Sequence, residues 1–317
     1  MQDLALAVDL GATRCRVAVV DRLGRVLARA EHPTHAAEGY QRCMAELVAV
    51  LKGFRARAGG DVVGVGLALA SPTEVPRGVL RNPPNLPGWE GFPIGRYLEE
   101  ALGLPVYAEN DANAAVVGEH LFGMGQRARH LVYLTVSTGI GGGVLVDGEL
   151  LRGPQGLAGE VRHLELQRDG PPCGCGSRAC LEALDSGTAI ARRGRERLQQ
   201  GAESRMRALV DGDVARLRAE EVLHAAAEGD PVALEVVAEA ADYLALGIIG
   251  LVHIFTPQVV VLGGGVCRAL MLFYPRLLTR VRSGVYRHLR DDVRLVPAAL
   301  GDDAGLVGAA ALAFRMA

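Results

Sequence analysis

An excess of charge of one sign is missing from this sequence. Its 317 residues carry 34 Lys and Arg against 36 Asp and Glu, which gives a formal net charge of −2. Proteins that bind nucleic acid usually display a basic stripe or face, so this balance predicts no nucleic-acid partner. Long apolar runs are missing too, because the longest, residues 243–255, falls short of the about 18 residues that a membrane-spanning helix needs. We therefore expect no membrane partner either.

The N-terminus lacks the features of a secretory signal. Met1 leads into the apolar segment LALAVDL without a basic region before it or a small-residue cleavage site after it. This predicts a cytoplasmic protein, in which thiols stay reduced. Half of the residues are hydrophobic, enough for a large core, and the length indicates two domains of ordinary size.

The two best-known phosphate-binding motifs, GxGxxG before a helix and GxxxxGK[ST], are absent from the glycine turns of this chain. Instead, three glycine turns follow apolar, β-prone runs, at residues 11–13, 138–143 and 263–265. Backbone N–H groups and a hydroxyl at such turns can cradle phosphate oxygens, and three converging strand ends would suit a nucleotide. For the turn at residues 11–13 alone, an ordinary hairpin with glycine at positive φ would be the favoured explanation.

Strand and helix patterns alternate along the chain, which predicts an α/β protein. Three β-prone runs separated by turns open the sequence, and a similar unit returns from residue 131, which indicates a duplicated domain plan. The predicted strands are 4–10, 15–20, 25–30, 62–70, 104–108, 131–137, 144–146 and 258–262. The predicted helices are 40–54, 94–101, 181–199, 231–255 and 305–314, and residues 72–89 form a proline-rich loop.

Cysteine is scarce, but three of the six cysteines lie close together with one histidine. The set is His163, Cys173, Cys175 and Cys180. One imidazole and three thiols are the ligands of a tetrahedral structural Zn²⁺ site. The alternatives are a disulfide, which conflicts with a cytoplasmic location, and a metal-free reduced cluster. We expect the scattered Cys15, Cys43 and Cys267 to be small buried hydrophobic residues.

Two carboxylates flank this ligand set, Glu160 before it and Glu182 after it. A bound ion would hold both of them in place, and fixed carboxylates suit a polyhydroxylated ligand. A further polar segment, Glu109-Asn110-Asp111, follows a predicted strand and precedes a helix-favouring run. Asp111 should lie near a helix N-terminus, where capping alone would explain it. The helix dipole there also favours the ionised carboxylate that a general base requires, so the sequence leaves both roles open.

In order along the chain, these motifs resemble the ROK family of repressors, unassigned reading frames and sugar kinases, and most of all its zinc-containing bacterial glucokinases. The motifs are DLGAT, ENDAN, STGIGGG, GE before His163, CGCGSRACLE and VVLGGG. The resemblance spans nearly the whole chain. It implies the two-lobed, actin-like (ribonuclease H-like) sugar kinase fold, with duplicated βββαβα domains and an interlobe cleft. The N-terminal lobe would comprise residues 1–113 plus 303–317, and the C-terminal lobe residues 114–302 with the zinc loop.

The resemblance also implies an activity, the transfer of the ATP γ-phosphate to the 6-hydroxyl of glucose or a related hexose. Asp111 would be the base, and Mg²⁺ would enter with ATP near Asp9. The sugar-binding residues would be Asn110, Asp111, Glu160, His163 and Glu182. The phosphates would lie on Gly11, Thr13, Thr138 and Gly139, and the adenosine near Gly264 and Gly265. His163 would bind zinc through one nitrogen and face the sugar with the other, or serve as a zinc ligand only. A homodimer or homotetramer is implied.

Three departures from the family pattern motivate a second hypothesis. Ala12 stands where kinases of the family usually have glycine, Ser71 lies in an altered Pro-Gly-Pro segment, and Arg162 replaces a common glycine. The alternative is a non-catalytic or weakly catalytic sugar-binding sensor. The helix-turn-helix segment of the family's repressors is not expected here, because the first strand begins at Leu4. The preferred hexose, and whether polyphosphate can replace ATP, stay open.

Overall fold

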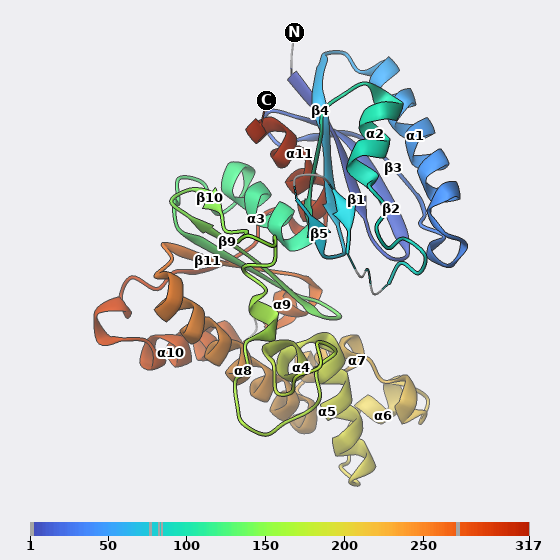
Figure 1. Ribbon diagram of the computed structural model, residues 1–317. Helices are drawn as coiled ribbons and strands as arrows, with labels where there is room; N and C mark the ends of the chain where they lie inside the picture. Colours follow the sequence, from blue (N-terminus) through green and yellow to red (C-terminus); the bar gives the residue numbers. More distant parts are fainter. Residues whose placement is uncertain (1–2, 76–77, 82, 84, 271–272, 317) are drawn as a thin grey trace. The chain divides into compact units, whose positions relative to one another are not determined.

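A computed structural model describes residues 3–75, 78–81, 83, 85–270 and 273–316. The chain divides into two compact units, which are described separately. Unit 1 comprises Met1–Leu131, Gly143–Gly159 and Ala298–Ala317, and unit 2 comprises Val132–Gly142 and Glu160–Pro297. Helices and strands alternate through both, which confirms the predicted α/β class (Figure 1).

The first sheet has the strand order β3-β2-β1-β4-β7. Its strands are β1 (Asp3–Leu10), β2 (Arg14–Asp21), β3 (Val26–Pro33), β4 (Asp61–Leu69) and β7 (Val106–Asn110). The first three form an antiparallel meander, and β4 and β7 continue from β1 in parallel. Burial follows position in the sheet: β1 is buried along nearly its whole length, whereas the edge strand β3 alternates between exposed and half-buried residues.

Helices cover both faces of this sheet. Figure 1 shows α1 (Tyr40–Arg57) and α2 (Ile94–Leu102) on one face and α11 (Ala304–Met316) on the other, beside α3 (Asp111–Phe122). Helix α11 approaches β4 closely because residue 66 of β4 is glycine. A Cβ at Gly66 would lie 1.7 Å from the carbonyl oxygen of Ala309 in α11. The C-terminal helix therefore returns to the N-terminal sheet, as the family resemblance implies.

The second sheet repeats the plan of the first, with the order β10-β9-β8-β11-β12. Its strands are β8 (Leu131–Val136), β9 (Ile140–Val146), β10 (Glu149–Leu150), β11 (Val259–Gly263) and β12 (Leu295–Pro297). As in the first sheet, three consecutive strands joined by short turns (β8, β9 and β10) come first, and two strands that follow helical segments (β11 and β12) complete the sheet. The matching order confirms the duplicated plan predicted from the sequence.

The other elements follow the sequence with a few differences. The remaining helices are α4 (Leu181–Asp185), α5 (Gly187–Gln199), α6 (Met206–Leu209), α7 (Ala219–Ala227), α8 (Pro231–Phe255), α9 (Gly265–Leu270) and α10 (Tyr274–Gly284). Short 3-10 turns occur at Ala36–Glu38, Val161–His163, Val214–Arg216, Arg287–Leu289 and Gly301–Asp303. Within the part of the chain that the structure describes, no helix combines the length and apolarity that crossing a membrane requires.

Two predictions about local structure are wrong in detail. The single helix predicted over 181–199 is interrupted at Ser186, whose extended backbone lets its hydroxyl accept a hydrogen bond from the backbone N–H of Ala189 and cap α5. The proline-rich loop contains a small hairpin, β5 (Thr73–Glu74) and β6 (Val79–Leu80). Residues 76–77, 82 and 84 of that loop lie outside the described residues.

Candidate functional site

Asp111 lies at the end of β7, where the chain turns into α3. Asn110 is the N-cap of this helix, because its side-chain oxygen accepts a hydrogen bond of 3.0 Å from the N–H of Ala112. Asp111 is the first helical residue, and its carboxylate oxygen Oδ1 lies 2.8 Å from the same N–H. The predicted helix N-terminus is confirmed, although the cap is Asn110. Because the cap is supplied by its neighbour, Asp111 is placed where the helix dipole favours its ionised form.

The neighbouring carboxylate, Glu109, is buried and holds this corner together. It accepts hydrogen bonds from the N–H of Asn110 (3.2 Å), the side-chain amide of Asn113 (3.1 Å) and the Nε–H of Arg152 (2.7 Å). Buried carboxylates need such partners. Arg152 was not predicted from the sequence, since nothing local marks it. The buried Glu109 inside ENDAN was the only signal that a cationic partner would be required.

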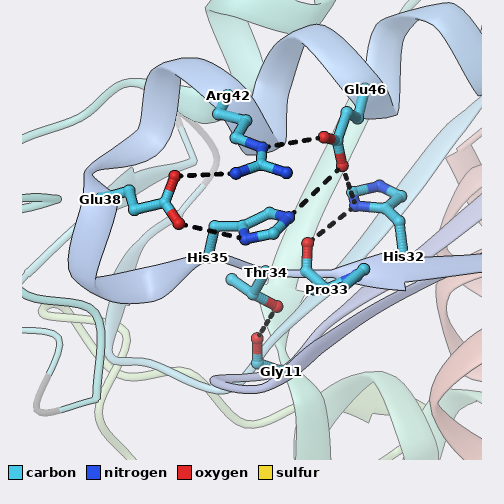
Figure 2. Close-up of polar contacts among 8 residues, drawn as sticks. All are labelled: Gly11, His32, Pro33, Thr34, His35, Glu38, Arg42 and Glu46. Carbon is cyan, nitrogen blue, oxygen red and sulfur yellow. Dashed lines mark hydrogen bonds and ion pairs between the residues drawn. The ribbon is translucent and has the colours of Figure 1, made fainter.

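The first glycine turn is fastened to the end of β3. The Thr34 hydroxyl donates to the carbonyl of Gly11 at 2.7 Å (Figure 2), and the Thr34 N–H donates to the carbonyl of Thr13 at 3.0 Å. Thr13 itself is exposed. These two bonds, one from the Thr34 side chain and one from its backbone, fix the turn and leave the Thr13 side chain open to solvent, where a phosphate group can approach it.

Asp9, just before this turn, is already engaged in unit 1. Its carboxylate forms an ion pair with Arg16, whose other amino group donates to the carbonyl of Asp302 at 2.7 Å. A Cβ at Gly305 would lie 2.3 Å from the Asp9 carboxylate, so α11 begins directly against it. With a guanidinium beside it, Asp9 fits an indirect contact to Mg²⁺ through water better than direct ligation.

The predicted thiol and imidazole set comes together in unit 2. The four potential ligand atoms of His163, Cys173, Cys175 and Cys180 all lie within 4.8 Å of one another. The Cys173 Sγ to His163 Nδ1 and Cys175 Sγ to Cys180 Sγ distances are both 3.7 Å. Ligands about 2.3 Å from a tetrahedral ion lie about 3.8 Å apart, so these residues fit a structural zinc ion.

Backbone bonds give the ligand loop its shape. The N–H of Cys173 donates to the carbonyl of Ser177, and the N–H of Gly176, at φ 94°, donates to the carbonyl of Cys173. Ala179, beside the last thiol, also has positive φ. Burial raises the pKa of Cys180 to about 12, and burial followed by the Arg162 charge lowers the pKa of His163. Without a cation, this pocket therefore favours neutral forms of both groups.

Arg162 contacts both of the predicted sugar-binding residues beside it. Its Nε lies 2.9 Å from Glu160 Oε2 and 3.0 Å from His163 Nε2. The other ring nitrogen of His163, Nδ1, faces the thiols. An Arg N–H can donate only to a bare Nε2, whereas a metal at Nδ1 of a neutral ring leaves the proton on Nε2. Metal binding at His163 and this hydrogen bond therefore exclude each other.

The second glycine turn is held from two sides. The Thr188 hydroxyl, at the start of α5, donates to the carbonyl of Thr138 at 2.9 Å. The Ile140 N–H donates to Glu182 Oε2 at 3.0 Å, and a Cβ at Gly139 would lie 2.7 Å from that oxygen. Glu182 thus braces the turn, a contact that the sequence did not predict. Gly264, at φ 89°, also needs to be glycine, since a Cβ would lie 2.2 Å from the carbonyl of Val136.

The predicted site residues therefore fall into two groups. Unit 1 contains Asp9, Gly11, Thr13, Asn110 and Asp111. Unit 2 contains the metal ligands with Thr138, Gly139, Glu160, Glu182, Gly264 and Gly265. Two sheets of matching strand order, each with a glycine turn between its first two strands, define the class: an α/β protein with the actin-like sugar kinase fold.

Comparison with known proteins identifies the family within this class. The model of the ROK family matches residues 5–316, so the chain belongs to the ROK family. The glucokinase of Thermotoga maritima is 35% identical over 309 residues, which cover 97% of this chain and 96% of that protein. The N-acetylmannosamine kinase of Salmonella typhi is 35% identical over 311 residues, or 97% of each chain.

Solved structures give the same family. A ROK family glucokinase from Streptomyces griseus, in complex with glucose and AMPPNP, is 34% identical with a TM-score of 0.79, and the match covers 98% of this chain and 99% of that one. A ROK family transcriptional regulator, a homologue of the E. coli MLC protein, is 26% identical with a TM-score of 0.86. That match covers 99% of this chain and 78% of the regulator. The family resemblance inferred from the motifs is confirmed.

Proposed function

We propose that this chain is an ATP-dependent hexose kinase that transfers the γ-phosphate of ATP to the 6-hydroxyl of glucose or a related hexose. The observation that carries the proposal is Asp111, a carboxylate at a helix N-terminus that follows the buried Glu109 and its ion pair with the partly exposed Arg152. Relatives at 35% identity include both a glucokinase and an N-acetylmannosamine kinase, which supports a sugar substrate.

In this mechanism Asp111 accepts the proton of the attacking hydroxyl, and the rest of the site positions the reactants. Phosphoryl transfer depends mostly on alignment and electrostatic stabilisation, so no covalent intermediate with the protein is needed. We assign the phosphates to Gly11, Thr13, Thr138 and Gly139, and the adenosine to Gly264 and Gly265. Magnesium bound with ATP neutralises phosphate charge, and Asp9 with its partner Arg16 is the carboxylate assigned near it.

We further propose that the Cys and His set holds a structural Zn²⁺, since four N and S ligands leave no open position for catalysis. The ion would order the loop between Glu160 and Glu182, and these two carboxylates with Asn110 and His163 would bind sugar hydroxyls. Support comes from the tetrahedral spacing of the four ligand atoms. A cytoplasmic location stays a prediction from the N-terminal sequence, and a homodimer or homotetramer stays a prediction from the resemblance.

The second candidate function is a sugar-binding sensor with little or no kinase activity. It is favoured by Arg162, whose guanidinium pairs with the proposed sugar-binding carboxylate of Glu160, and by Ala12 in the first phosphate turn. A transcriptional regulator also lies among the similar structures. The sensor would retain the metal site and bind the hexose but use ATP poorly.

A coupled assay of ADP release separates the two functions. Purified protein is tested with glucose, mannose, N-acetylglucosamine and N-acetylmannosamine, and sugar binding is measured in parallel by calorimetry. ADP release with at least one hexose, and product phosphorylated at the 6-position, is the expected result. Sugar binding without ADP release would establish the sensor instead. Replacing ATP with polyphosphate in the same assay tests the phosphate donor.

A further inference from the structure

A second cluster of soft metal ligands lies inside unit 1, and none of its three residues has been given a role above. It comprises Cys15 at the start of β2, His32 at the end of β3 and Cys43 in the first turn of α1. One ligand atom from each lies within 4.8 Å of the others, and Cys15 and His32 are direct partners across the two strands. Both thiols are fully buried. The fold thus joins two cysteines that the sequence presents as scattered hydrophobic residues.

The imidazole of His32 is held in one tautomer. Its Nδ1 lies 3.0 Å from the carbonyl oxygen of Pro33 and 3.3 Å from Glu46 Oε2 (Figure 2). Both partners accept hydrogen bonds, so the proton of the neutral ring resides on Nδ1. The other nitrogen, Nε2, is buried and has no hydrogen-bond partner among the described residues. A buried acceptor left in this state destabilises the folded protein, and a ligand bound to Nε2 would remove that penalty.

This arrangement has the features of a prepared metal ligand. Metal-binding histidines generally donate their second N–H to a carboxylate or a backbone carbonyl, and His32 has both. Glu46 is itself bonded to Arg42, at 3.2 Å, which steadies its carboxylate (Figure 2). The thiols supply sulfur, the ligand preferred by Zn²⁺ and Cu⁺. Two thiolates also neutralise the charge of one Zn²⁺ ion, which suits a buried position.

We propose that Cys15, His32 and Cys43 form a second metal site, which binds a thiophilic cation, Zn²⁺ or Cu⁺, between β2, β3 and α1. As each metal–sulfur bond forms, the thiol proton leaves to solvent, so binding releases two protons. The neighbouring Cys43 thiol, followed by burial, raises the pKa of Cys15 well above its usual range.

The site also has a structural connection to the first glycine turn. Cys15 follows Thr13 by two residues, and Thr34, which bonds both Gly11 and Thr13, follows His32 by two residues. A cation bound to Cys15 and His32 would clamp the two strand ends that hold this turn. Its removal should therefore loosen the turn before it unfolds unit 1, whose core is large.

Metal stoichiometry tests the proposal without reference to kinase activity. Full-length protein is loaded with Zn²⁺, washed with a weak chelator and measured by mass spectrometry. Wild type should retain two zinc ions per chain, and His32→Gln and Cys43→Ala one each. Cys175→Ser should also retain one, from the loss of the first site. Cys267→Ser, which removes a lone buried thiol elsewhere, is the matched control and should retain two.

Two further measurements distinguish Cu⁺ from Zn²⁺ at the new site and test the proposal without depending on variants that could misfold. Titration of metal-free protein with Cu⁺ against a chromogenic chelator identifies a site that prefers copper. If the new site prefers copper, the wild-type protein should bind one equivalent of Cu⁺ that the His32→Gln variant does not bind. The Cys175→Ser variant disrupts the first metal site and leaves the new site unmutated. After this variant is loaded with zinc, X-ray absorption at the zinc edge should show two sulfur neighbours and one nitrogen neighbour. One zinc per wild-type chain, with no Cu⁺ equivalent dependent on His32, would overturn the proposal.

Discussion

At the scale of single residues, Asp111 tests the chemistry most directly. Asp111→Asn keeps the size of the side chain and its position at the start of α3 but removes the base. We expect turnover to fall by about 10²–10⁴-fold, the usual effect of losing a general base, while the dissociation constant for the hexose changes little. Steady-state kinetics and calorimetry measure the two quantities.

The control for this substitution is Asp61→Asn, at the exposed start of β4, which should leave both values unchanged. Undiminished turnover in Asp111→Asn would remove this residue from the mechanism. A large loss of sugar affinity would instead assign Asp111 to binding.

Arg162 is one of the three positions that we expect to depart from the family pattern. Arg162→Gly frees the Glu160 carboxylate from the guanidinium, whose Nε lies 2.9 Å from it. A partly exposed ion pair is worth about 0.2–1 kcal/mol, so we expect KM for the hexose to fall by about 1.5- to 5-fold with kcat nearly unchanged. Arg168→Gly, an exposed site in the same loop, is the control. A rise in KM would show that Arg162 itself binds the sugar.

At the scale of elements, the metal loop should control sugar binding more than stability. Cys175→Ser removes an exposed ligand whose side chain packs against no core. We expect loss of the proposed zinc ion and weaker hexose affinity, with only a small change in melting temperature, because the ion would order a loop in a chain with an ample core. Metal analysis, calorimetry and thermal unfolding give the three values. Metal-free protein with normal sugar affinity would contradict this role.

The contact of α11 with β4 depends on a residue without a side chain. In Gly66→Ala the new Cβ would meet the backbone oxygen of Ala309 at 1.7 Å, so helix and strand must separate. Overpacking of this kind destabilises by about 1–3 kcal/mol. Denaturant unfolding should show that loss for Gly66→Ala. Gly59→Ala, where a Cβ meets nothing within 4 Å, should be close to wild type, and equal stability of the two variants would refute the packing argument.

At the scale of the whole molecule, Asp185 should influence how stability depends on pH. Both carboxylate oxygens are buried without a hydrogen-bond partner among the described residues. Burial raises the pKa of Asp185 well above its usual range, against the opposing charge of Arg193. The folded protein therefore holds a proton that the unfolded chain, with a pKa of about 3.9, releases. The stability from this group is complete below that pH and declines as pH rises toward the folded pKa.

Asp185→Asn removes this dependence because the amide is neutral at every pH. We expect the variant to gain on wild type as pH rises above about 4, by up to about 1.4 kcal/mol per pH unit until the folded pKa is reached. Denaturant unfolding between pH 4 and pH 8 measures the difference. Asp211→Asn, at a side chain that is 89% exposed, should parallel wild type. Parallel curves for Asp185→Asn would show that the carboxylate ionises while folded.

The sequence predicted most of the fold because its signals are local. Apolar periodicity located both β meanders and the long helix α8, and the return of the strand pattern from Leu131 predicted the duplication that the matching strand orders confirm. Its failures have local physical causes as well. A serine cap divides the helix predicted over 181–199, and β12 is too short to show a pattern. The predicted lobe boundaries, at 113/114 and 302/303, stay predictions.

By itself, the sequence determined which chemical groups this protein possesses: an Asp at a strand-to-helix junction, glycine turns after strands, and three thiols with an imidazole at metal-ligand spacing. These depend on neighbours in the chain, so pattern and spacing reveal them. Only the tertiary structure decided which distant groups meet, such as Arg152 with Glu109, or Cys43 with Cys15 and His32. A buried carboxylate such as Glu109 is stabilised by a partner, and the fold, not the spacing in the chain, determines which group is within reach.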